Sequence, residues 1–388
     1  MTINRRAVTL GLAAVFAAGS GAAWYLRQNR GPLAASSQTS AVELKPVATG
    51  FDNPWGLAFL PDGTALVTER PGNLRHVALD TGVVSEPLAG VPMVDANGQG
   101  GLLGLALDPD FASNRLIYMS FAEPRDDGNA TAVFRARLNA DASALEEGTV
   151  IFRQNRTAQS GHHFGSRLVF DRAGQLFVTT GERNVLREEA QNPAVHVGKV
   201  LRISRDGSPA PGNPALPGWA PEVWSIGHRN IQAAALHPAT GQLWTAEHGA
   251  RGGDEVNTPL AGKNYGWPVI SYGREYSLDP IGEGTAKSGM EQPLHFWDPS
   301  IAPSGMTFVT TDTYPGWQGS MLVGALAGQH VSRLAWDGET AVSEEKLFEG
   351  VARFRDVVQG PDGRIYVLTD ESAPGGALMV IAAREGGS

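Results

Sequence analysis

One sequence pattern recurs six times along this chain and restricts its fold more than any other feature. Each copy has a run of alternating apolar and polar residues, a turn rich in Pro, Asp or Gly, and a second alternating run. The first copy reads GLAFLPDGTALVTE at residues 56–69, and the third reads RLVFDRAGQLFVTTGE at residues 167–182. Alternation with a period of two, interrupted by turn residues, predicts a β-hairpin in each copy.

The spacing of the copies indicates how the hairpins are assembled. Successive copies begin 48 to 71 residues apart, and a repeat of about 50 residues with insertions is typical of a β-propeller with one four-stranded sheet per repeat. Further strands are expected between the hairpins, at residues 132–138, 198–204, 330–337 and 377–383. The sequence therefore predicts an all-β fold, a six-bladed β-propeller of four-stranded antiparallel blades.

The segment before the first hairpin has a predicted role in closing the ring. Residues 42–50, VELKPVATG, form an extra strand-like run, which we expect to pair with the last blade and so remove exposed strand edges. No long amphipathic helix is expected. Residues 41–388 are thus predicted to form a single propeller domain.

The first 40 residues are interpreted separately. Arg5 and Arg6 precede an apolar run at residues 7–26, and small residues follow at 33–39. This order is typical of a secretory signal peptide with a twin-arginine character, or of an N-terminal membrane anchor, because the run is long enough to span a bilayer. We expect export to the periplasm, and the sequence leaves cleavage open. Residues 1–40 are assigned to this signal or anchor and a linker.

Composition excludes several functional classes. The net charge of −9 and the pI of about 5.5 argue against binding to nucleic acid. An anionic ligand would therefore depend on local arginines and not on the overall field of the protein. The chain has no cysteine, so disulfides, thiolate metal sites and cysteine nucleophiles are excluded.

Polar residues stand directly before the first strand of several repeats. Because the loops at one end of a propeller converge on its axis, residues far apart in the sequence can share one pocket there. The alternative is that they are turn residues and surface charges. The candidates are Gln99, His162, His163, Arg229, Asn230, Arg353 and Arg355.

The stretch from Trp224 to Pro268 adds two chemical signals. Its Gly-rich acidic loop, Gly249–Glu255, can bring carbonyl and carboxylate oxygens together, which suits a hard cation such as Ca²⁺. The pair Arg229-Asn230 suits a planar anionic ligand, because a guanidinium binds carboxylates in a fork. An ordinary loop with a surface arginine is the alternative.

Taken together, the motifs resemble those of one enzyme family. They are GQGGLLGLALDPDF, HHFGSRLVF, GKVLRI, GHRN, DEVN, KNYGWP, PSIAPSG and RFRDV, and they extend from about residue 45 to the end of the chain. They are similar to those of the soluble quinoprotein glucose dehydrogenases and aldose sugar dehydrogenases. The resemblance implies a six-bladed propeller that binds pyrroloquinoline quinone (PQQ) and Ca²⁺. It also implies oxidation of aldose sugars at C1 to the lactone, with electrons passed to an external acceptor. The His162-His163 pair resembles the aldose branch.

The resemblance also implies a role for individual residues. His163 matches the general base, and Arg229 would stabilise negative charge on the quinone oxygen. The carbonyl groups of Gly249 and Ala250 match ligands of the catalytic calcium, whereas Glu255 and Tyr265 match a second, structural calcium site. The positions that match cofactor contacts are Gln99, Arg229, Asn230, Tyr276, Ser300, Arg353 and Arg355.

One departure from the family keeps other readings open. The family usually has a quinone-contacting lysine where this chain has Ala327. A calcium-dependent lactonase is one alternative, because six-bladed propellers also host calcium hydrolases, although it would place several carboxylates and Asn, and not His and Arg, in the central channel. A non-catalytic propeller that binds carbohydrate or protein is another. The protein is expected to be a monomer or a homodimer.

Overall fold

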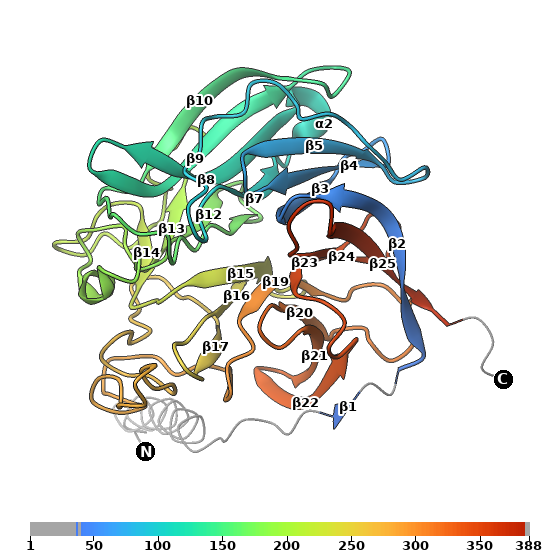
Figure 1. The fold of residues 1–388 in the computed structure, drawn as a ribbon. Helices are drawn as coiled ribbons and strands as arrows, with labels where there is room; N and C mark the ends of the chain where they lie inside the picture. Colours follow the sequence, from blue (N-terminus) through green and yellow to red (C-terminus); the bar gives the residue numbers. More distant parts are fainter. Residues whose placement is uncertain (1–35, 38–39, 385–388) are drawn as a thin grey trace, which may run out of the picture.

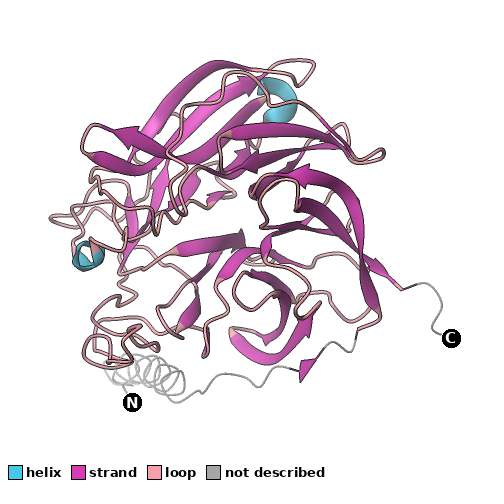
Figure 2. Ribbon diagram, in the orientation of Figure 1, coloured by secondary structure: helices cyan, strands magenta, loops and turns pink. Residues whose placement is uncertain are grey.

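Six β-sheets surround a common axis in the computed structural model, which describes residues 36–37 and 40–384 (Figure 1). The predicted signal or anchor at residues 1–35 lies outside the described residues. Strands dominate the described part of the chain, whose helices are the short α2 (Phe111–Asn114) and the 3₁₀-helix η1 (Arg187–Gln191) (Figure 2). Neither helix approaches the length and hydropathy needed to cross a membrane.

Each sheet is one blade, and, apart from two strands contributed by the N-terminal end, its strands run in sequence order from the axis outwards. Blade 1 contains β3 (Pro54–Phe59), β4 (Thr64–Glu69), β5 (Asn73–Ala78) and β6 (Val83–Val84). Blade 2 contains β7 (Leu102–Leu107), β8 (Leu116–Arg125), β9 (Gly128–Leu138) and β10 (Leu145–Arg153). Blade 3 contains β11 (Leu168–Phe170), β12 (Leu176–Thr179), β13 (Lys199–Ile203) and β14 (Val223–Ile226).

The remaining blades follow the same plan. Blade 4 contains β15 (Ile231–Leu236), β16 (Leu243–Glu247), β17 (Asp254–Asn257) and β18 (His295–Trp297). Blade 5 contains β19 (Pro303–Phe308), β20 (Met321–Ala325), β21 (His330–Asp337) and β22 (Thr340–Leu347). Blade 6 takes only β23 (Phe354–Gln359), β24 (Ile365–Thr369) and β25 (Gly376–Ala383) from the end of the chain. The predicted six-bladed propeller is confirmed.

The N-terminal strand completes the last blade, as predicted. Strand β2 (Val42–Phe51) pairs antiparallel with β25, with Val42 opposite Ala383. The ring is thereby closed by strands from both ends of the domain, so no gap is left between blades 6 and 1. A further short strand, β1 (Ser36–Ser37), pairs parallel with β22 of blade 5, within the segment that the sequence analysis assigned to the linker.

The first hairpin illustrates why the repeated sequence forms these sheets. Asp62 accepts hydrogen bonds from the backbone nitrogen and the hydroxyl of Thr64, at 3.0 and 2.6 Å. Gly63 between them has a φ of +85°, a conformation that glycine adopts without strain. The Pro-Asp-Gly-Thr sequence therefore makes the turn, and the alternating residues on either side form β3 and β4.

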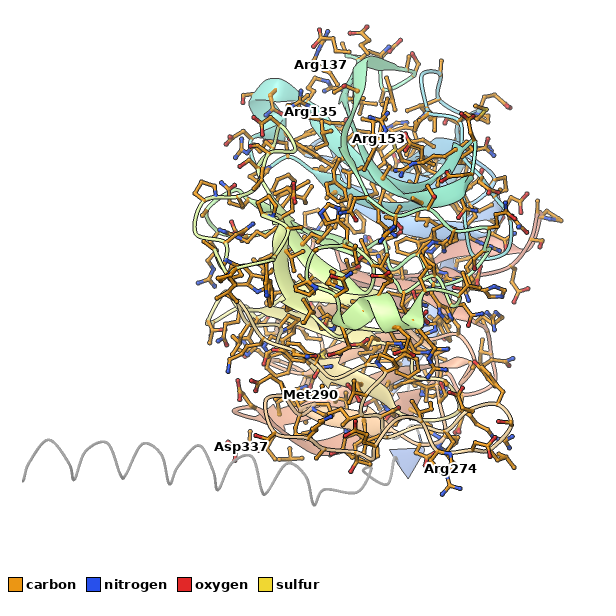
Figure 3. The ribbon with its side chains drawn as sticks, turned by 90° about the vertical axis from the view of Figure 1, so that its left-hand side faces the viewer. Arg135, Arg137, Arg153, Arg274, Met290 and Asp337 are labelled. Atoms are coloured by element: carbon orange, nitrogen blue, oxygen red, sulfur yellow. The ribbon has the colours of Figure 1, made fainter. Side chains whose placement is uncertain are left out.

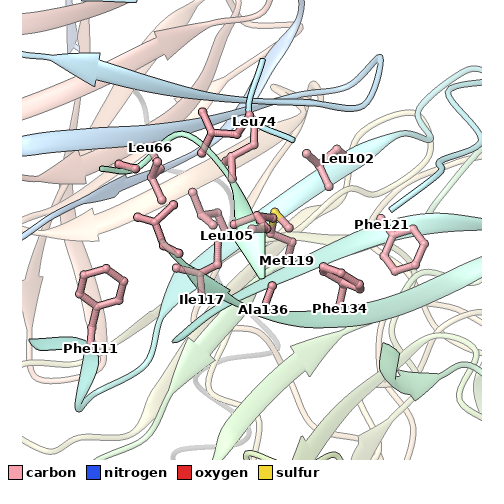
Figure 4. Packing of buried hydrophobic residues seen from close by; sticks show 14 of the residues in the cluster. Leu66, Leu74, Leu102, Leu105, Phe111, Ile117, Met119, Phe121, Phe134 and Ala136 are labelled. Atoms are coloured by element: carbon pink, nitrogen blue, oxygen red, sulfur yellow. The ribbon is translucent and has the colours of Figure 1, made fainter. Parts of the chain in front are cut away.

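The hydrophobic core lies between the blades. The largest cluster joins Leu66 and Leu74 of blade 1 to Leu105, Ile117 and other residues of blade 2 (Figure 4). Comparable clusters lie at the other blade interfaces. Because each blade buries both faces of its sheet, burial of apolar surface holds the ring together and leaves the axis for polar groups.

The innermost strands contact one another in a ring, in the order β3, β7, β11, β15, β19, β23 and back to β3. We call the end of the ring at which these strands begin the upper face. Below it, Arg167 crosses the axis and binds Asp356 at 2.9 Å, with its guanidinium 4.2 Å from the ring of Trp55. This buried group, from blades 3, 6 and 1, forms the floor of any site on the upper face.

Other arginines lie far from the axis. In the side view, Arg135, Arg137 and Arg153 lie on blade 2 towards one end of the molecule (Figure 3). Arg137 forms ion pairs with Glu146 and Glu147, and Arg153 pairs with Glu123. These are surface charges of the kind expected on any protein.

Candidate active site on the upper face

His163 lies at the upper face and is held from two sides. Its backbone nitrogen donates to the side-chain oxygen of Gln99 at 2.9 Å, and its Nδ1 lies 2.5 Å from Oε1 of Glu182. Only 7% of the residue is exposed, and its φ is +53°. A left-handed conformation is uncommon for a residue other than glycine and is often found at functional sites. The ring is therefore fixed in a single orientation.

The surroundings of His163 favour its neutral form. Burial lowers the pKa of His163, and the positive charge of Arg229 lowers it further, whereas the hydrogen bond to Glu182 acts in the opposite direction. If Nδ1 carries the proton that Glu182 accepts, Nε2 is left as a free base. The site thus contains a proton acceptor that is ready at neutral pH.

Arg229 and Asn230 lie beside this histidine. The backbone nitrogen of Glu182 donates to the carbonyl of Arg229 at 2.9 Å, and Oδ1 of Asn230 accepts from the backbone of Gly165 at 3.0 Å. Arg229 itself donates from its backbone to Glu247 at 2.6 Å and from Nη1 to the carbonyl of His248 at 3.1 Å. Gln99, His163, Arg229 and Asn230, predicted to share a site, are therefore brought together.

His248 is a second neutral histidine in this group, which the sequence analysis did not single out. Burial lowers its pKa to about 3, and the charges of Arg229, His163 and Arg355 contribute in the same direction. Its Nε2 lies 2.8 Å from the carbonyl oxygen of Pro303. A neutral ring with Nε2 protonated fits this contact, so His248 links blade 4 to blade 5.

The two arginines of blade 6 share one carboxylate. Nη2 of Arg355 lies 2.7 Å from Oδ2 of Asp370, and Nη2 of Arg353 lies 3.6 Å from the same oxygen. Arg355 also donates to Gln232 of blade 4 at 2.7 Å, and Arg353 donates to the carbonyl of Leu326 at 3.1 Å. Arg355 is buried, while 41% of the Arg353 side chain is exposed. The pair forms the blade 6 side of the site.

Carboxylates at the ends of second strands hold these groups, and none of them was predicted from the sequence. Glu182 follows β12 closely, Glu247 ends β16, and Asp370 follows β24. Each accepts a hydrogen bond from a candidate residue or its neighbour: from His163, from Arg229 and from Arg355. The signal was present in the repeat, since four of the six copies end in an acid: Glu69, Glu182, Glu247 and Asp370–Glu371.

The loop that carries Gly249 is fixed by Asp254. This buried carboxylate accepts from the backbone of Gly249, Ile301 and Ala302 at 2.7 Å each, and from the hydroxyl of Ser300 at 2.6 and 2.7 Å. A Cβ on Gly249 would lie 2.2 Å from the carbonyl oxygen of Gly252, so the loop closes only with glycine. Ser300, predicted to lie near the quinone, therefore directs its hydroxyl to Asp254.

A small cavity beside this loop brings together residues predicted to bind calcium. Glu255 and Tyr265 line it, with Gly249, Glu247 and Arg229. The cavity has a volume of about 10 Å³, which leaves room for about one water molecule or one ion. Burial and the nearby charge of Glu247 together raise the pKa of Glu255 to about 8.

Three observations bear on whether a cation fits here. Two carboxylates and a glycine loop supply oxygen atoms, the donors that Ca²⁺ prefers. Over residues 40–384, no three His, Asp or Glu side chains converge in a way that would hold a metal, so a cation would need backbone carbonyls as well. Ala250 lies in the same loop and is buried. The residues present fit a calcium ion bound largely by carbonyl groups.

Two of the predicted positions are exposed to solvent. Tyr276 is 71% exposed and lies in the long loop between β17 and β18. Ala327, where the resemblance predicted a lysine, is exposed, and its backbone nitrogen donates to the carbonyl of Ile301 at 3.0 Å. The preceding carbonyl, of Leu326, binds Arg353. A longer side chain at 327 would therefore start next to the arginine pair.

Several buried donors of the site point to an anionic ligand. Nε of Arg229, Nδ2 of Asn230 and Nε of Arg355 have no hydrogen-bond partner within the described part of the chain. Buried polar groups in folded proteins are nearly always paired, and these three lie at or near one face of the ring. A planar ligand with several carboxylates and ring carbonyls, such as PQQ, fits this set of donors.

Comparisons with known proteins agree with this chemistry. The sequence profile of the glucose/sorbosone dehydrogenase family matches residues 51–379. The aldose sugar dehydrogenase YliI of Escherichia coli K12 is 43% identical over 352 residues, which cover 89% of this chain and 94% of that protein. A glucose dehydrogenase of known crystal structure is 46% identical, with a TM-score of 0.85 over 88% of this chain and 100% of that one. The PQQ-bound aldose sugar dehydrogenase of Streptomyces coelicolor is 30% identical, with a TM-score of 0.74 over 90% and 99%.

Proposed function

We propose that this chain, which belongs to the glucose/sorbosone dehydrogenase family, is a PQQ-dependent aldose sugar dehydrogenase that oxidises C1 of its substrate to the lactone. The observation that carries the proposal is the neutral His163 beside buried donors that lack partners in the described chain. The relatives named for sugar oxidation, and the one solved with PQQ, support the same reaction class.

The residues of the upper face would divide the work as follows. Arg353, Arg355, Asn230 and Gln99 would hold the cofactor by charge-assisted and amide hydrogen bonds. The carbonyl groups of Gly249 and Ala250 would hold a calcium ion, and Glu255 with Tyr265 would hold calcium in the small cavity that Gly249 also lines. When bound, PQQ supplies the acceptor for the hydride that leaves C1 of the sugar.

His163 would move the proton. Its Nε2 takes the proton of the C1 hydroxyl as the hydride leaves, and general bases of this kind contribute about 10²- to 10⁴-fold to the rate. The carboxylate of Glu182, 2.5 Å from Nδ1, stabilises the imidazolium that forms. Arg229 supplies positive charge where negative charge develops, and such electrostatic stabilisation is greatest in a site from which water is excluded.

The proposed function also includes an external electron acceptor and a location in the periplasm. Electrons would pass to an external acceptor after each turnover. The sequence at residues 5–39 supports export to the periplasm, with or without membrane anchoring.

One reconstitution experiment tests the proposal. Purified protein is mixed with PQQ and Ca²⁺ and assayed with a dye acceptor across a panel of aldoses. Dye reduction that requires sugar, PQQ and Ca²⁺ is expected. Absence of both PQQ binding and dye reduction would reject the proposal, and lactone hydrolysis without PQQ would support the lactonase alternative.

A further inference from the structure

Arg183 is a buried arginine whose hydrogen bonds all go to neutral groups. It follows Glu182 directly and has no exposed surface. Nη1 donates to the carbonyl of His162, and Nη2 donates to the carbonyl of Ser160 at 2.6 Å and to the side-chain oxygen of Asn129. Burying a charged group is unfavourable unless its hydrogen bonds are made. The question is what this arginine does that a smaller, neutral side chain could not.

Two of these bonds, to the carbonyl groups of Ser160 and His162, are made to the loop that carries His163. The guanidinium carbon lies 3.5 Å from the centre of the Phe164 ring, and the backbone nitrogen of Arg183 donates to the carbonyl of His163 at 3.3 Å. Together with the bonds to residues 160 and 162, Arg183 touches the chain on both sides of His163. A planar fork of donors that also stacks on an aromatic ring is particular to arginine.

The same side chain reaches a second loop of the site through Asn129. Nδ2 of Asn129 donates to Asp95 at 2.7 Å, and Asp95 lies in the loop that carries Gln99. Gln99 in turn donates from its backbone to the carbonyl of Gly161 at 2.7 Å. Arg183 therefore connects the two loops whose residues, Gln99 and His163, are hydrogen-bonded to each other.

The backbone is shaped to allow this arrangement. Arg183 and its neighbour Asn184 have φ angles of +61° and +64°, a left-handed conformation that is unfavourable for residues with side chains. This turn lets two consecutive residues reach the same loop: Glu182 binds the ring of His163, and Arg183 binds the backbone around it. Strain of this kind persists where the surrounding contacts require it.

We propose that Arg183 is a positioning residue for His163. It holds residues 160–164 so that Nδ1 of the ring faces Glu182 and Nε2 faces the substrate. For its kinetic consequences this inference rests on the proposed dehydrogenase function. Its structural consequence, the environment of the His163 ring, can be measured without any activity.

Two substitutions separate position from charge. Arg183→Gln removes both the planar fork of hydrogen-bond donors and the positive charge. Arg183→Lys keeps the charge but loses the fork of donors. In both, a loosened loop exposes the ring to water, so NMR titration of His163, assigned with His163→Gln, should give a pKa closer to the ordinary histidine value than in the wild type. In the reconstituted enzyme, kcat should fall about tenfold or more while KM for the sugar changes by less than about threefold, because misplaced catalytic groups slow the chemical step.

Arg202→Gln is the matched control. Arg202 lies at the other end of blade 3, binds Asp171 at 2.7 Å and lies 5.3 Å from the centre of the Trp224 ring. Its loss should lower the melting temperature without altering the titration of His163. Unchanged His163 titration in both Arg183 variants, whatever their melting temperatures, would overturn the proposal. If the wild type oxidises no sugar, the proposed function fails, and the titration still decides the role of Arg183.

Discussion

Nδ1 of His163 lies 2.5 Å from Oε1 of Glu182, a residue 19 positions further along the chain. The histidine precedes the first strand of blade 3 and the glutamate follows the second, so the hairpin brings them together at the upper face. A carboxylate on Nδ1 fixes the tautomer of the ring and leaves Nε2 free to accept a proton. The pair has the geometry of an oriented general base.

Replacing His163 tests its role as the base. His163→Gln should lower kcat by at least about 10²-fold, because general base catalysis is lost, while PQQ still binds through the arginines. His76→Gln is the control, since His76 lies in blade 1 and binds Thr64. Absorbance titration with PQQ and steady-state kinetics measure the two effects. Turnover near that of the wild type would exclude His163 as the base.

The pH dependence of the reaction tests the pairing of His163 with Glu182. Since burial lowers the pKa of His163, kcat/KM should fall only as the pH drops below the ordinary histidine value of about 6.5. Glu182→Gln removes a carboxylate that raises this pKa, so the midpoint of the fall should move to still lower pH. The plateau should drop by about tenfold or more, because the imidazolium loses its counter-charge. A midpoint that stays or rises would contradict the proposed pair.

The ring of blades could be predicted from the sequence because its repeat is local. Each hairpin is specified by alternation and turn residues within about 15 positions, and β2 could be placed because a leftover strand closes the ring. His163 and Arg229 could be found because they precede the first strands of the repeats. Their partners Glu182 and Glu247 lie on the second arm of the same hairpins, at the ends of strands that have the same alternating sequence as the other repeats.

Other features depend on contacts that no local pattern specifies. Asp254 matched the motif DEVN, but besides Gly249 it binds Ser300, Ile301 and Ala302, which lie 46 to 48 positions away. The exposure of Tyr276 depends on how the long loop between β17 and β18 folds, and its sequence has neither the alternation nor the spacing of the repeats. The chemistry of the site could therefore be predicted better than its supporting contacts.

Asp254 should be needed for the shape of the calcium loop. Asp254→Asn replaces one of two acceptor oxygens by an NH2 group, which cannot accept, so either the backbone donor of Gly249 or those of Ile301 and Ala302 lose their acceptor. An unpaired buried donor costs about 1–3 kcal/mol, so the melting temperature and the Ca²⁺-dependent binding of PQQ should both fall. Ser300→Ala, which leaves the backbone bonds intact, should have a smaller effect. Equal effects of the two substitutions would argue against this role of Asp254.

Calcium binding at the small cavity should depend on Glu255. A ligand that binds only the folded state raises the melting temperature, so Ca²⁺ should stabilise the wild type. Glu255→Ala should remove most of that shift, because the cavity loses a carboxylate ligand. Glu283→Ala is the control, since 64% of the Glu283 side chain is exposed. If Ca²⁺ shifts Glu255→Ala as much as the wild type, the cation binds elsewhere.

Ala327 gives the sharpest test of how PQQ is held. The residue is exposed and follows Leu326, whose carbonyl binds Arg353, so a lysine there would start beside the arginine pair. Of the two nearby donors that could replace it, His330 is buried with Nδ1 2.9 Å from the carbonyl oxygen of Gly328, whereas Gln329 is exposed. Gln329 is therefore the better substitute.

Two variants decide whether the lysine is missing or replaced. A charge-assisted contact contributes about 1.5–3 kcal/mol, so Ala327→Lys should bind PQQ about ten- to a hundredfold more tightly if nothing fills its place. If Gln329 already donates to the cofactor, Ala327→Lys should gain little, and Gln329→Ala should weaken binding by a similar factor. Titration with PQQ at saturating Ca²⁺ measures both. Because Gln329 is exposed on the same short loop, we expect the second result; tighter binding by Ala327→Lys together with no loss in Gln329→Ala would contradict it.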